Sequence, residues 1–350
     1  QTRALAVRMA ASCGRRLDDA CPVVDATLPD GTRLNAVLPP LSADGTLICL
    51  RTKRRSAFTL GQLVEAGTVA PGLDSVLAAL IETRASCLIT GATGTGKTTL
   101  LAALLGLVSA TERIVCIEEA AELRPDHPHV LHLQERGDNV QGVGAVPMSA
   151  LVRTALRMRP DRIVLGECRG PEVRDVLTAL NTGHEGGWAT LHANSPADVP
   201  ARLTALGALA GLDETAVAAQ AVSALDAVIH LRRSGATGGG IAGRRSPREG
   251  TAERSSTRGS DGPDSCASPE QDVMSSRSSR TRRYVSGIGM LRRGAQGSLV
   301  CEDALIVALD GAAGTVCAVS AGPAVDRLAE RIGAAPVAAA MKGGTSWTPL

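Results

Sequence analysis

Short apolar runs alternate with longer segments of helical periodicity between residues 84 and 233. The buried runs predict strands at 87–90, 113–117, 162–165, 188–192 and 227–231. The amphipathic segments between them predict helices at 98–107, 148–158, 171–180 and 196–206. Because strand and helix alternate, the pattern indicates βαβ units and an α/β fold around a parallel sheet.

The segments on either side of this region have a different pattern. Upstream, "PDGTRLNAVLPPL" and "GTLICLRTKRRS" each predict a strand, the first after a D-G turn. Downstream, residues 234–283 contain Ser, Gly, Arg and Pro with almost no apolar side chain, so we predict a disordered insert. Apolar pattern resumes with "YVSGIGML" and "LVCEDALIVA", and "AVDRLAERI" predicts a short helix.

These patterns predict a domain order in which the insert interrupts one domain. The expected units are an N-terminal domain and linker at 1–80, an α/β domain at 81–233 and 284–332, the insert at 234–283, and a flexible tail at 333–350. The length of 350 residues suits about two domains. Because the first residue is Gln, we expect the N-terminal domain to be truncated.

Composition narrows the classes of function. Hydrophobic residues make up 44% of the chain, yet it has one Phe, one Tyr and two Trp, so aromatic platforms for single-stranded nucleic acid are scarce. A net charge of +2 does not favour a polyanionic partner. We therefore expect no stable nucleic-acid complex.

Cysteine usage and hydropathy favour a cytoplasmic protein. The nine cysteines form no C-x-x-C pair, so neither a disulfide framework nor a zinc site is indicated. His184, His192 and the "DHPHVLH" histidines do not form a converging ligand set. No run reaches the roughly 18 apolar residues of a membrane span, so any membrane role is expected to be peripheral.

The segment "GATGTGKTTL" carries the most specific motif. Residues 91–98 match G-x-x-x-x-G-K-[ST] between a predicted strand and a predicted helix. Glycines let successive N–H groups point at phosphate oxygens, and the helix N-terminus favours the same anion. Lys97 is expected to reach the β- and γ-phosphates and Thr98 to hold Mg²⁺. The sequence therefore predicts a site for a nucleoside triphosphate, most simply ATP.

Hydrolysis also needs carboxylates near the metal and the attacking water. "RIVCIEEAAEL" runs from a strand into Glu118 and Glu119, and "DRIVLGECRGPE" runs from a strand into Glu167. Since the carboxyl ends of parallel strands share one edge of a sheet, both groups are expected near the phosphate loop. Acids at these positions could instead serve a helix dipole or a solvated loop.

Taken together, these segments resemble the type II/type IV secretion ATPase superfamily. "RMRPDRIVLGECRGPEV" is similar to its Walker B box, "ALNTGHEGGWATLHANSP" to its histidine box and "ERIVCIEEAAELRPDHPHV" to its acidic box. With "GTRLNAVLPPLS" upstream, the spacing most resembles the tight-adherence (Flp) pilus assembly branch, the TadA/CpaF-like ATPases. The resemblance covers about residues 10–233 and 284–308.

The resemblance implies a RecA-like P-loop ATPase domain with a smaller α+β N-terminal domain. It implies ATP and Mg²⁺ as ligands, with the nucleotide held by Gly91, Ala92, Thr93, Gly94, Thr95, Gly96, Lys97, Thr98 and Thr99. It implies that Glu167 polarises water, that Glu118 and Glu119 act on Mg²⁺ or water, and that His184 and His192 sense the γ-phosphate or couple it to movement. Arg33 and Arg51 are candidate γ-phosphate contacts, with Arg153, Arg157, Arg159 and Arg169 as alternatives.

Two features depart from the family pattern. Glu119 stands where the family has Asp, which keeps the charge on a longer arm, and the insert follows the nucleotide motifs.

The resemblance also implies an assembly and a cellular role. We expect a homo-oligomer, as a hexameric ring, on the inner face of the cell membrane with an inner-membrane platform protein. The expected function is an ATP-driven motor for secretion or Flp-type pilus assembly. A RecA-like helicase or DNA-transfer motor, and a nucleotide-binding scaffold with little turnover, remain alternatives.

Overall fold

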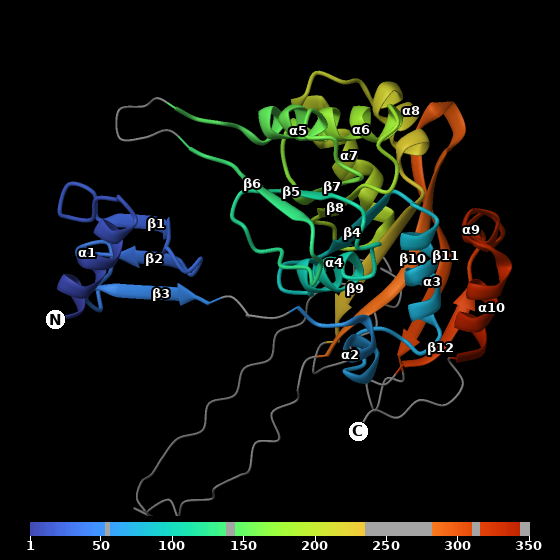
Figure 1. The fold of residues 1–350 in the computed structure, drawn as a ribbon, viewed down its shortest axis with the longest axis horizontal. Helices are drawn as coiled ribbons and strands as arrows, with labels where there is room; N and C mark the ends of the chain where they lie inside the picture. Colours follow the sequence, from blue (N-terminus) through green and yellow to red (C-terminus); the bar gives the residue numbers. More distant parts are fainter. Residues whose placement is uncertain (53–56, 138–143, 235–281, 310–315, 344–350) are drawn as a thin grey trace, which may run out of the picture.

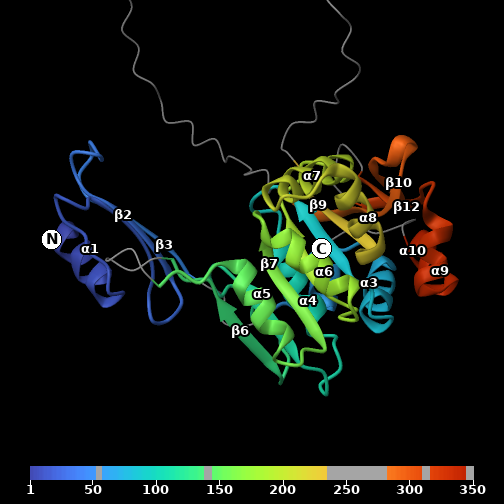
Figure 2. The ribbon, with the colours of Figure 1, turned by 90° about the horizontal axis from the view of Figure 1, so that it is seen from above.

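The computed structural model describes residues 1–52, 57–137, 144–234, 282–309 and 316–343. These residues form two units that lie side by side, a small N-terminal unit and a larger α/β domain (Figures 1 and 2). The N-terminal unit packs helix α1 (Thr2–Ser12) on an antiparallel sheet of β1 (Val23–Thr27), β2 (Arg33–Val37) and β3 (Leu47–Arg51), in that order. Its small core includes Leu34 and Ala36.

Register within this small sheet decides where its arginines point. Arg33 on β2 is the direct partner of Arg51 on β3, so both side chains lie on one face. Leu34, the next residue, is fully buried in the core on the other face, because successive side chains in a strand alternate. The arginine face is therefore the face not needed for packing against α1.

The larger domain is built on a nine-stranded sheet of order β12-β11-β10-β9-β4-β8-β7-β5-β6. The strands are β4 (Cys87–Gly91), β5 (Ile114–Glu118), β6 (Val130–Gln134), β7 (Arg162–Cys168), β8 (Trp188–Leu191), β9 (Ala227–Arg233), β10 (Arg283–Arg293), β11 (Leu299–Leu309) and β12 (Val316–Ala321). Neighbouring strands in the part β9-β4-β8-β7-β5-β6 pair in parallel. Strands β10, β11 and β12 extend the sheet beyond β9 with antiparallel pairs.

Helices cover both faces of this sheet, which gives three layers (Figure 1). One face packs against α2 (Leu60–Glu65), α3 (Leu73–Glu82), α4 (Lys97–Leu105), α9 (Val325–Ile332) and α10 (Ala334–Gly343). The other packs against α5 (Met148–Leu156), α6 (Glu172–Asn181), α7 (Val199–Leu209) and α8 (Glu214–Ala224). Strands β4 and β5 are buried at every position, as expected for a parallel sheet covered on both sides. The predicted RecA-like α/β architecture is confirmed.

The predicted strands between residues 84 and 233 are all present. The helix expected at 196–206 divides into a short 3-10 turn, Pro196–Asp198, and α7, which carries Pro200 in its first turn. Proline suits that position because its missing N–H would have no helical partner there. The elements that were not predicted are strands β1, β6 and β12 and helices α1, α2, α3, α8 and α10.

Two expected boundaries differ from the observed packing. Helices α2 and α3, which we grouped with the N-terminal domain at 1–80, belong to the core of the larger domain. Residues 334–343, expected within a flexible tail, form α10 instead. Val337 and Ala340 of α10 are buried, and a Cβ on Gly72 would come within 2.6 Å of Ala339 O, so α10 lies tightly against the start of α3.

Most of the predicted disordered insert, 235–281, lies outside the described residues, as do 344–350 of the predicted tail. The sheet continues directly on both sides of the insert, where Ser234 N donates a hydrogen bond of 2.8 Å to Arg282 O. Arg283, expected as the last residue of the insert, is the first residue of β10. Among the described helices, none has the length and hydropathy that a membrane crossing requires.

Candidate nucleotide-binding site

The phosphate loop connects β4 to α4, as the sequence predicts. Gly91, Gly94 and Gly96 have φ values of 149°, 74° and 99°, in the region that side chains with a Cβ avoid. A Cβ on Gly91 would also come within 2.5 Å of Leu231 O on the adjacent β9. The loop therefore needs glycine at these positions, and it presents its backbone and the N-terminus of α4 to an anion.

Lys97 folds back over this loop at the start of α4. Its Nζ donates hydrogen bonds to Gly91 O at 2.9 Å and Ala92 O at 3.2 Å, and only 8% of the residue is exposed. Burial lowers the pKa of the Lys97 ammonium, and the carboxylate of Glu167 partly opposes that change. These geometries fit a triphosphate, because Gly91, Gly94 and Gly96 put no Cβ atom in the loop at their positions and Lys97 supplies a cation beside it.

Glu167 reaches the same place from β7. The pairing of β7 with β8 is irregular between Leu165 and Cys168, and such irregularities re-aim a side chain. Glu167 Oε1 lies 2.9 Å from Nε2 of His192, the residue after β8. Since β8 lies between β4 and β7, the two strand ends bring Glu167 and His192 beside the phosphate loop.

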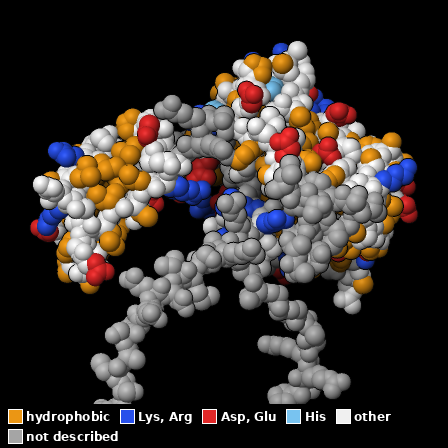
Figure 3. Space-filling view, turned by 90° about the horizontal axis from the view of Figure 1, so that it is seen from below, with side chains coloured by type: hydrophobic (Ala, Val, Ile, Leu, Met, Phe, Trp, Pro, Cys, Tyr) orange, Lys and Arg blue, Asp and Glu red, His pale blue; other side chains and the backbone are white. Residues whose placement is uncertain are grey.

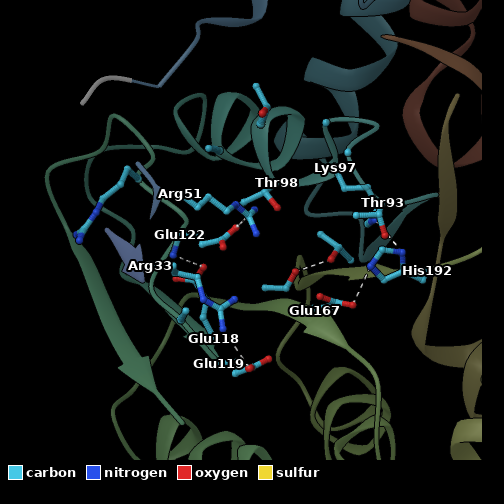
Figure 4. A pocket seen from close by; sticks show the side chains of 18 of the residues that line it. Arg33, Arg51, Thr93, Lys97, Thr98, Glu118, Glu119, Glu122, Glu167 and His192 are labelled. Carbon is cyan, nitrogen blue, oxygen red and sulfur yellow. Dashed lines mark hydrogen bonds and ion pairs between the residues drawn. The ribbon is translucent and has the colours of Figure 1, made fainter. Parts of the chain in front are cut away.

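His192 joins the loop to the carboxylate. Its Nδ1 lies 3.3 Å from Lys97 Nζ and its Nε2 faces Glu167 (Figure 4). An ammonium can only donate, so Nδ1 accepts from Lys97 and Nε2–H donates to Glu167. Burial first, and then the charge of Lys97, lower the pKa of His192, which keeps the imidazole neutral at neutral pH.

Glu118 and Glu119 take different positions although they are adjacent. Glu118 is 3% exposed, and its Oε1 accepts hydrogen bonds from Glu122 N at 2.9 Å and Leu123 N at 2.8 Å. A Cβ on Gly166 would lie 2.7 Å from Glu118 Cγ, so Gly166 makes room for this buried side chain. Glu118 thus fixes the loop of residues 119–123 that follows β5, which we call the acidic loop. Glu119, in contrast, extends toward Arg33 and Arg169.

Arginines from both units meet this acidic loop (Figure 4). Arg33 Nη2 lies 3.5 Å from Glu119 Oε1, and Arg51 Nη2 lies 2.9 Å from Glu122 Oε2. From the larger domain, Arg169 forms ion pairs with Glu119 and, at 3.4 Å, with Glu167. Seen from below, Lys and Arg side chains gather where the two units face each other (Figure 3).

These groups surround one cavity of about 770 Å³. Its lining includes most of the expected site residues, namely Arg33, Arg51, Thr93, Gly94, Gly96, Lys97, Thr98, Thr99, Glu118, Glu119, Glu167 and His192. Ala92 and Thr95 form the base of the loop, where Thr95 Oγ1 donates to Ala92 O at 2.8 Å.

The structure separates His184 from this group. His184 precedes β8 and His192 follows it, so the two histidines lie at opposite ends of one strand. His184 is not among the lining residues of the cavity. The alternative Arg153 is likewise elsewhere, pairing with Asp175 at 3.1 Å. A role for His184 in direct contact with nucleotide is therefore not supported.

Other lining residues were missed in the sequence. Phe58, Arg124 and Arg283 also face the cavity. Phe58 is the single Phe of the chain, and this rarity could have drawn attention to it, but no sequence motif connects it to the phosphate loop. Arg283 follows the insert, so no short spacing ties it to the nucleotide motifs.

A glycine-rich loop between β4 and α4, an acid at the end of β7 in the same parallel sheet and helices on both faces of that sheet are the features of a P-loop nucleotide-binding fold. Comparison with models of protein families identifies the family. Residues 1–276 match the model of the type II/IV secretion system protein family, and the chain belongs to that family.

Similar proteins come from several secretion and transfer systems. The chain is 52% identical over 237 residues to "Putative conjugal transfer protein Rv3659c" of Mycobacterium tuberculosis, covering 66% of this chain and 67% of that protein. It is 37% identical to the type IV secretion system protein PtlH of Bordetella pertussis, covering 57% and 66%. It is 32% identical to the conjugal transfer protein TrbB of Rhizobium radiobacter, covering 62% and 66%. The aligned segments thus span about two thirds of each relative.

Solved structures with a similar chain include the VirB11 ATPase of the Brucella suis type IV secretion system. That comparison has 25% identity, a TM-score of 0.39, and coverage of 65% of this chain and 74% of that one. The pilus retraction motor PilT with bound ADP has 24% identity, a TM-score of 0.45, and coverage of 60% and 58%.

Proposed function

We propose that this chain is an ATP-hydrolysing motor of a secretion or Flp-type pilus assembly system. In this proposal, hydrolysis within an oligomeric ring, expected as a hexamer, drives export or assembly of pilin at the inner face of the cell membrane. An inner-membrane platform protein receives the force. Family membership and the cavity between the two units support the proposal.

The observation that carries the proposal is the linked set of Lys97, His192 and Glu167 beside the phosphate loop. Bound MgATP would supply the phosphoanhydride and the divalent charge. Lys97 and the loop N–H groups would hold phosphate oxygens, and the Thr98 hydroxyl would serve as a ligand for Mg²⁺. Glu167 orients and polarises the attacking water, and the Nε2–H of His192 holds the Glu167 carboxylate in place.

The acidic loop and the arginines that pair with it line the side of the cavity opposite the phosphate loop, where their charges offset each other. Arg33, Arg51 and Arg169 are cations that can stabilise charge at the terminal phosphate, and Glu119 and Glu122 now hold them near it. Arg33 and Arg51 come from the N-terminal unit, so movement of that unit would change the charge around the terminal phosphate. Such a coupling is what a motor requires.

The first test measures ATPase rate against protein concentration for the chain and for Lys97→Ala. A turnover per chain that rises with concentration and disappears in the variant supports an active site completed in an oligomer. Tight ATP binding without turnover at any concentration would instead favour a nucleotide-binding scaffold. A concentration-independent rate would remove this support for the ring.

The names of two relatives favour a second function, a motor of a conjugal DNA-transfer system. DNA-stimulated hydrolysis with a steep dependence on salt would support it, because contacts to phosphates release counterions. A rate that double-stranded and single-stranded DNA leave unchanged would argue against it.

A further inference from the structure

Two arginines flank the phosphate loop from the side that faces away from Glu167. Arg233 ends β9 and Arg283 begins β10, and the two residues are direct partners in the antiparallel pair. Their side chains therefore lie on one face of the sheet. Both residues are exposed.

This face lies against the loop. The position that a Cβ on Gly94 would take is 3.8 Å from Arg233 Nη1, and the corresponding position on Gly96 is 3.8 Å from Arg283 Cδ. Arg283 also lines the cavity. The two guanidinium groups thus stand next to the glycines that form the phosphate cradle.

The charge environment of this pair differs from that of the other cavity arginines. Arg33, Arg51 and Arg169 each have a carboxylate partner. For Arg233 and Arg283, the described part of the chain contains no ion pair. Two like charges directly opposite each other in a sheet repel, and an anion between them relieves that repulsion.

Strand order indicates which part of a nucleotide would meet these arginines. β4, which leads into the loop, has β8 on one side and β9 on the other. Glu167 and His192 lie on the β8 side, where the terminal phosphate must meet the attacking water. The remaining phosphates and the nucleoside then extend toward β9 and β10.

We propose that Arg233 and Arg283 bind the phosphates that are not transferred, the α- and β-phosphates of the nucleotide. Planar guanidinium groups suit this contact because they can bind phosphate oxygens with two parallel hydrogen bonds. The proposal rests on the proposed function, since it requires that the cavity binds a nucleotide. In this proposal, the arginines of β9 and β10 bind ADP and ATP alike. The arginines that pair with the acidic loop, such as Arg51, favour ATP over ADP.

Titration calorimetry of the full chain with MgADP and with a magnesium β,γ-imido ATP analogue tests this assignment. Arg233→Ala and Arg283→Ala are each expected to weaken both ligands equally, by about tenfold, the typical loss of one charge-assisted hydrogen bond. Arg51→Ala is expected to weaken the ATP analogue only, because ADP lacks the γ-phosphate.

Arg232→Ala is the matched control. Arg232 is also an exposed arginine on β9, but it alternates to the opposite face of the strand, so its loss should leave both affinities unchanged. If Arg283→Ala lowers the unfolding temperature, Arg283→Lys replaces it. That variant keeps the charge without the planar fork, and its expected loss is about threefold.

The outcomes separate this inference from the proposed function. ADP and analogue binding within about twofold of wild type in both alanine variants, or a loss for the analogue alone, would overturn the inference. Wild-type binding that Lys97→Ala abolishes would still support the ATPase. If the wild-type chain binds neither ligand, the proposed function and the inference both fail.

Discussion

The two sides of the phosphate loop differ in how their charges are compensated. Toward β8 and β7, Glu167 is paired with His192 and Arg169, and Glu119 is paired with Arg33 and Arg169. Toward β9 and β10, two arginines face the loop, and the described residues provide no carboxylate for either. Paired charges keep catalytic side chains in fixed positions, which a chemical step requires. Unpaired cations favour binding of an anion.

The largest effect is expected for Glu167→Gln, which would separate chemistry from binding. We expect turnover to fall by between about a hundredfold and ten-thousandfold, the range for loss of a general base, while ADP and ATP affinities stay within about twofold. Single-turnover hydrolysis and calorimetry measure the two effects. The exposed Glu330→Gln on α9 is the control, and a parallel loss of affinity in Glu167→Gln would contradict the comparison.

A second effect is expected for His192→Gln, which removes the link between Lys97 and Glu167. We expect kcat to fall by about tenfold to a hundredfold, the order that a displacement of roughly 1 Å at a reacting group costs. KM should change little, because the phosphates keep their loop contacts.

The pH profile tests the same link. The pKa of His192 is lowered from 6.5, so the neutral imidazole is the working form, and protonation would remove the acceptor for Lys97. In the wild type, kcat should therefore fall only at pH values below 6.5, and His192→Gln should abolish this acid limb. An acid limb that persists in the variant would assign the titration to another group.

The smallest effect is expected for Glu122→Gln, which frees Arg51 without removing a cation. Exposed ion pairs contribute little, so we expect affinity for the ATP analogue to rise by only about twofold to threefold, with ADP unchanged. Asp19→Asn, in the exposed pair with Arg3 on the N-terminal unit, is the control. A weaker affinity in Glu122→Gln would mean that Glu122 supports binding directly.

Local signals in the sequence were sufficient for most strands of the large sheet, though not for β6 or β12, and for half of the site. The phosphate loop is contiguous, and Glu167 follows an apolar strand, so strand order alone places them together. His184 and His192 are close in sequence, yet a buried strand between them carries them to opposite edges. Spacing along the chain cannot show this, because a strand moves its two ends apart.

The residues that were missed depend on tertiary packing. The apolar stripe of α3 does not indicate which of two cores it joins, and the Ala-rich α10 is ordered by its contact with α3. Arg233 and Arg283 become neighbours only when β9 and β10 pair across the insert. Neither arginine belongs to a recognisable motif, so in the sequence they cannot be distinguished from ordinary surface arginines.

The hydrogen bond between Ser234 N and Arg282 O closes the sheet at the point where the chain leaves and re-enters it. Since the two ends are already joined, the architecture sets no required length for the connection. As a general rule, doubling the length of a loop costs only about 0.6 kcal/mol more in closure entropy. This junction is therefore a place where evolution, or a protein engineer adding a reporter domain, can change the length of the chain while the register of β9 and β10 stays the same.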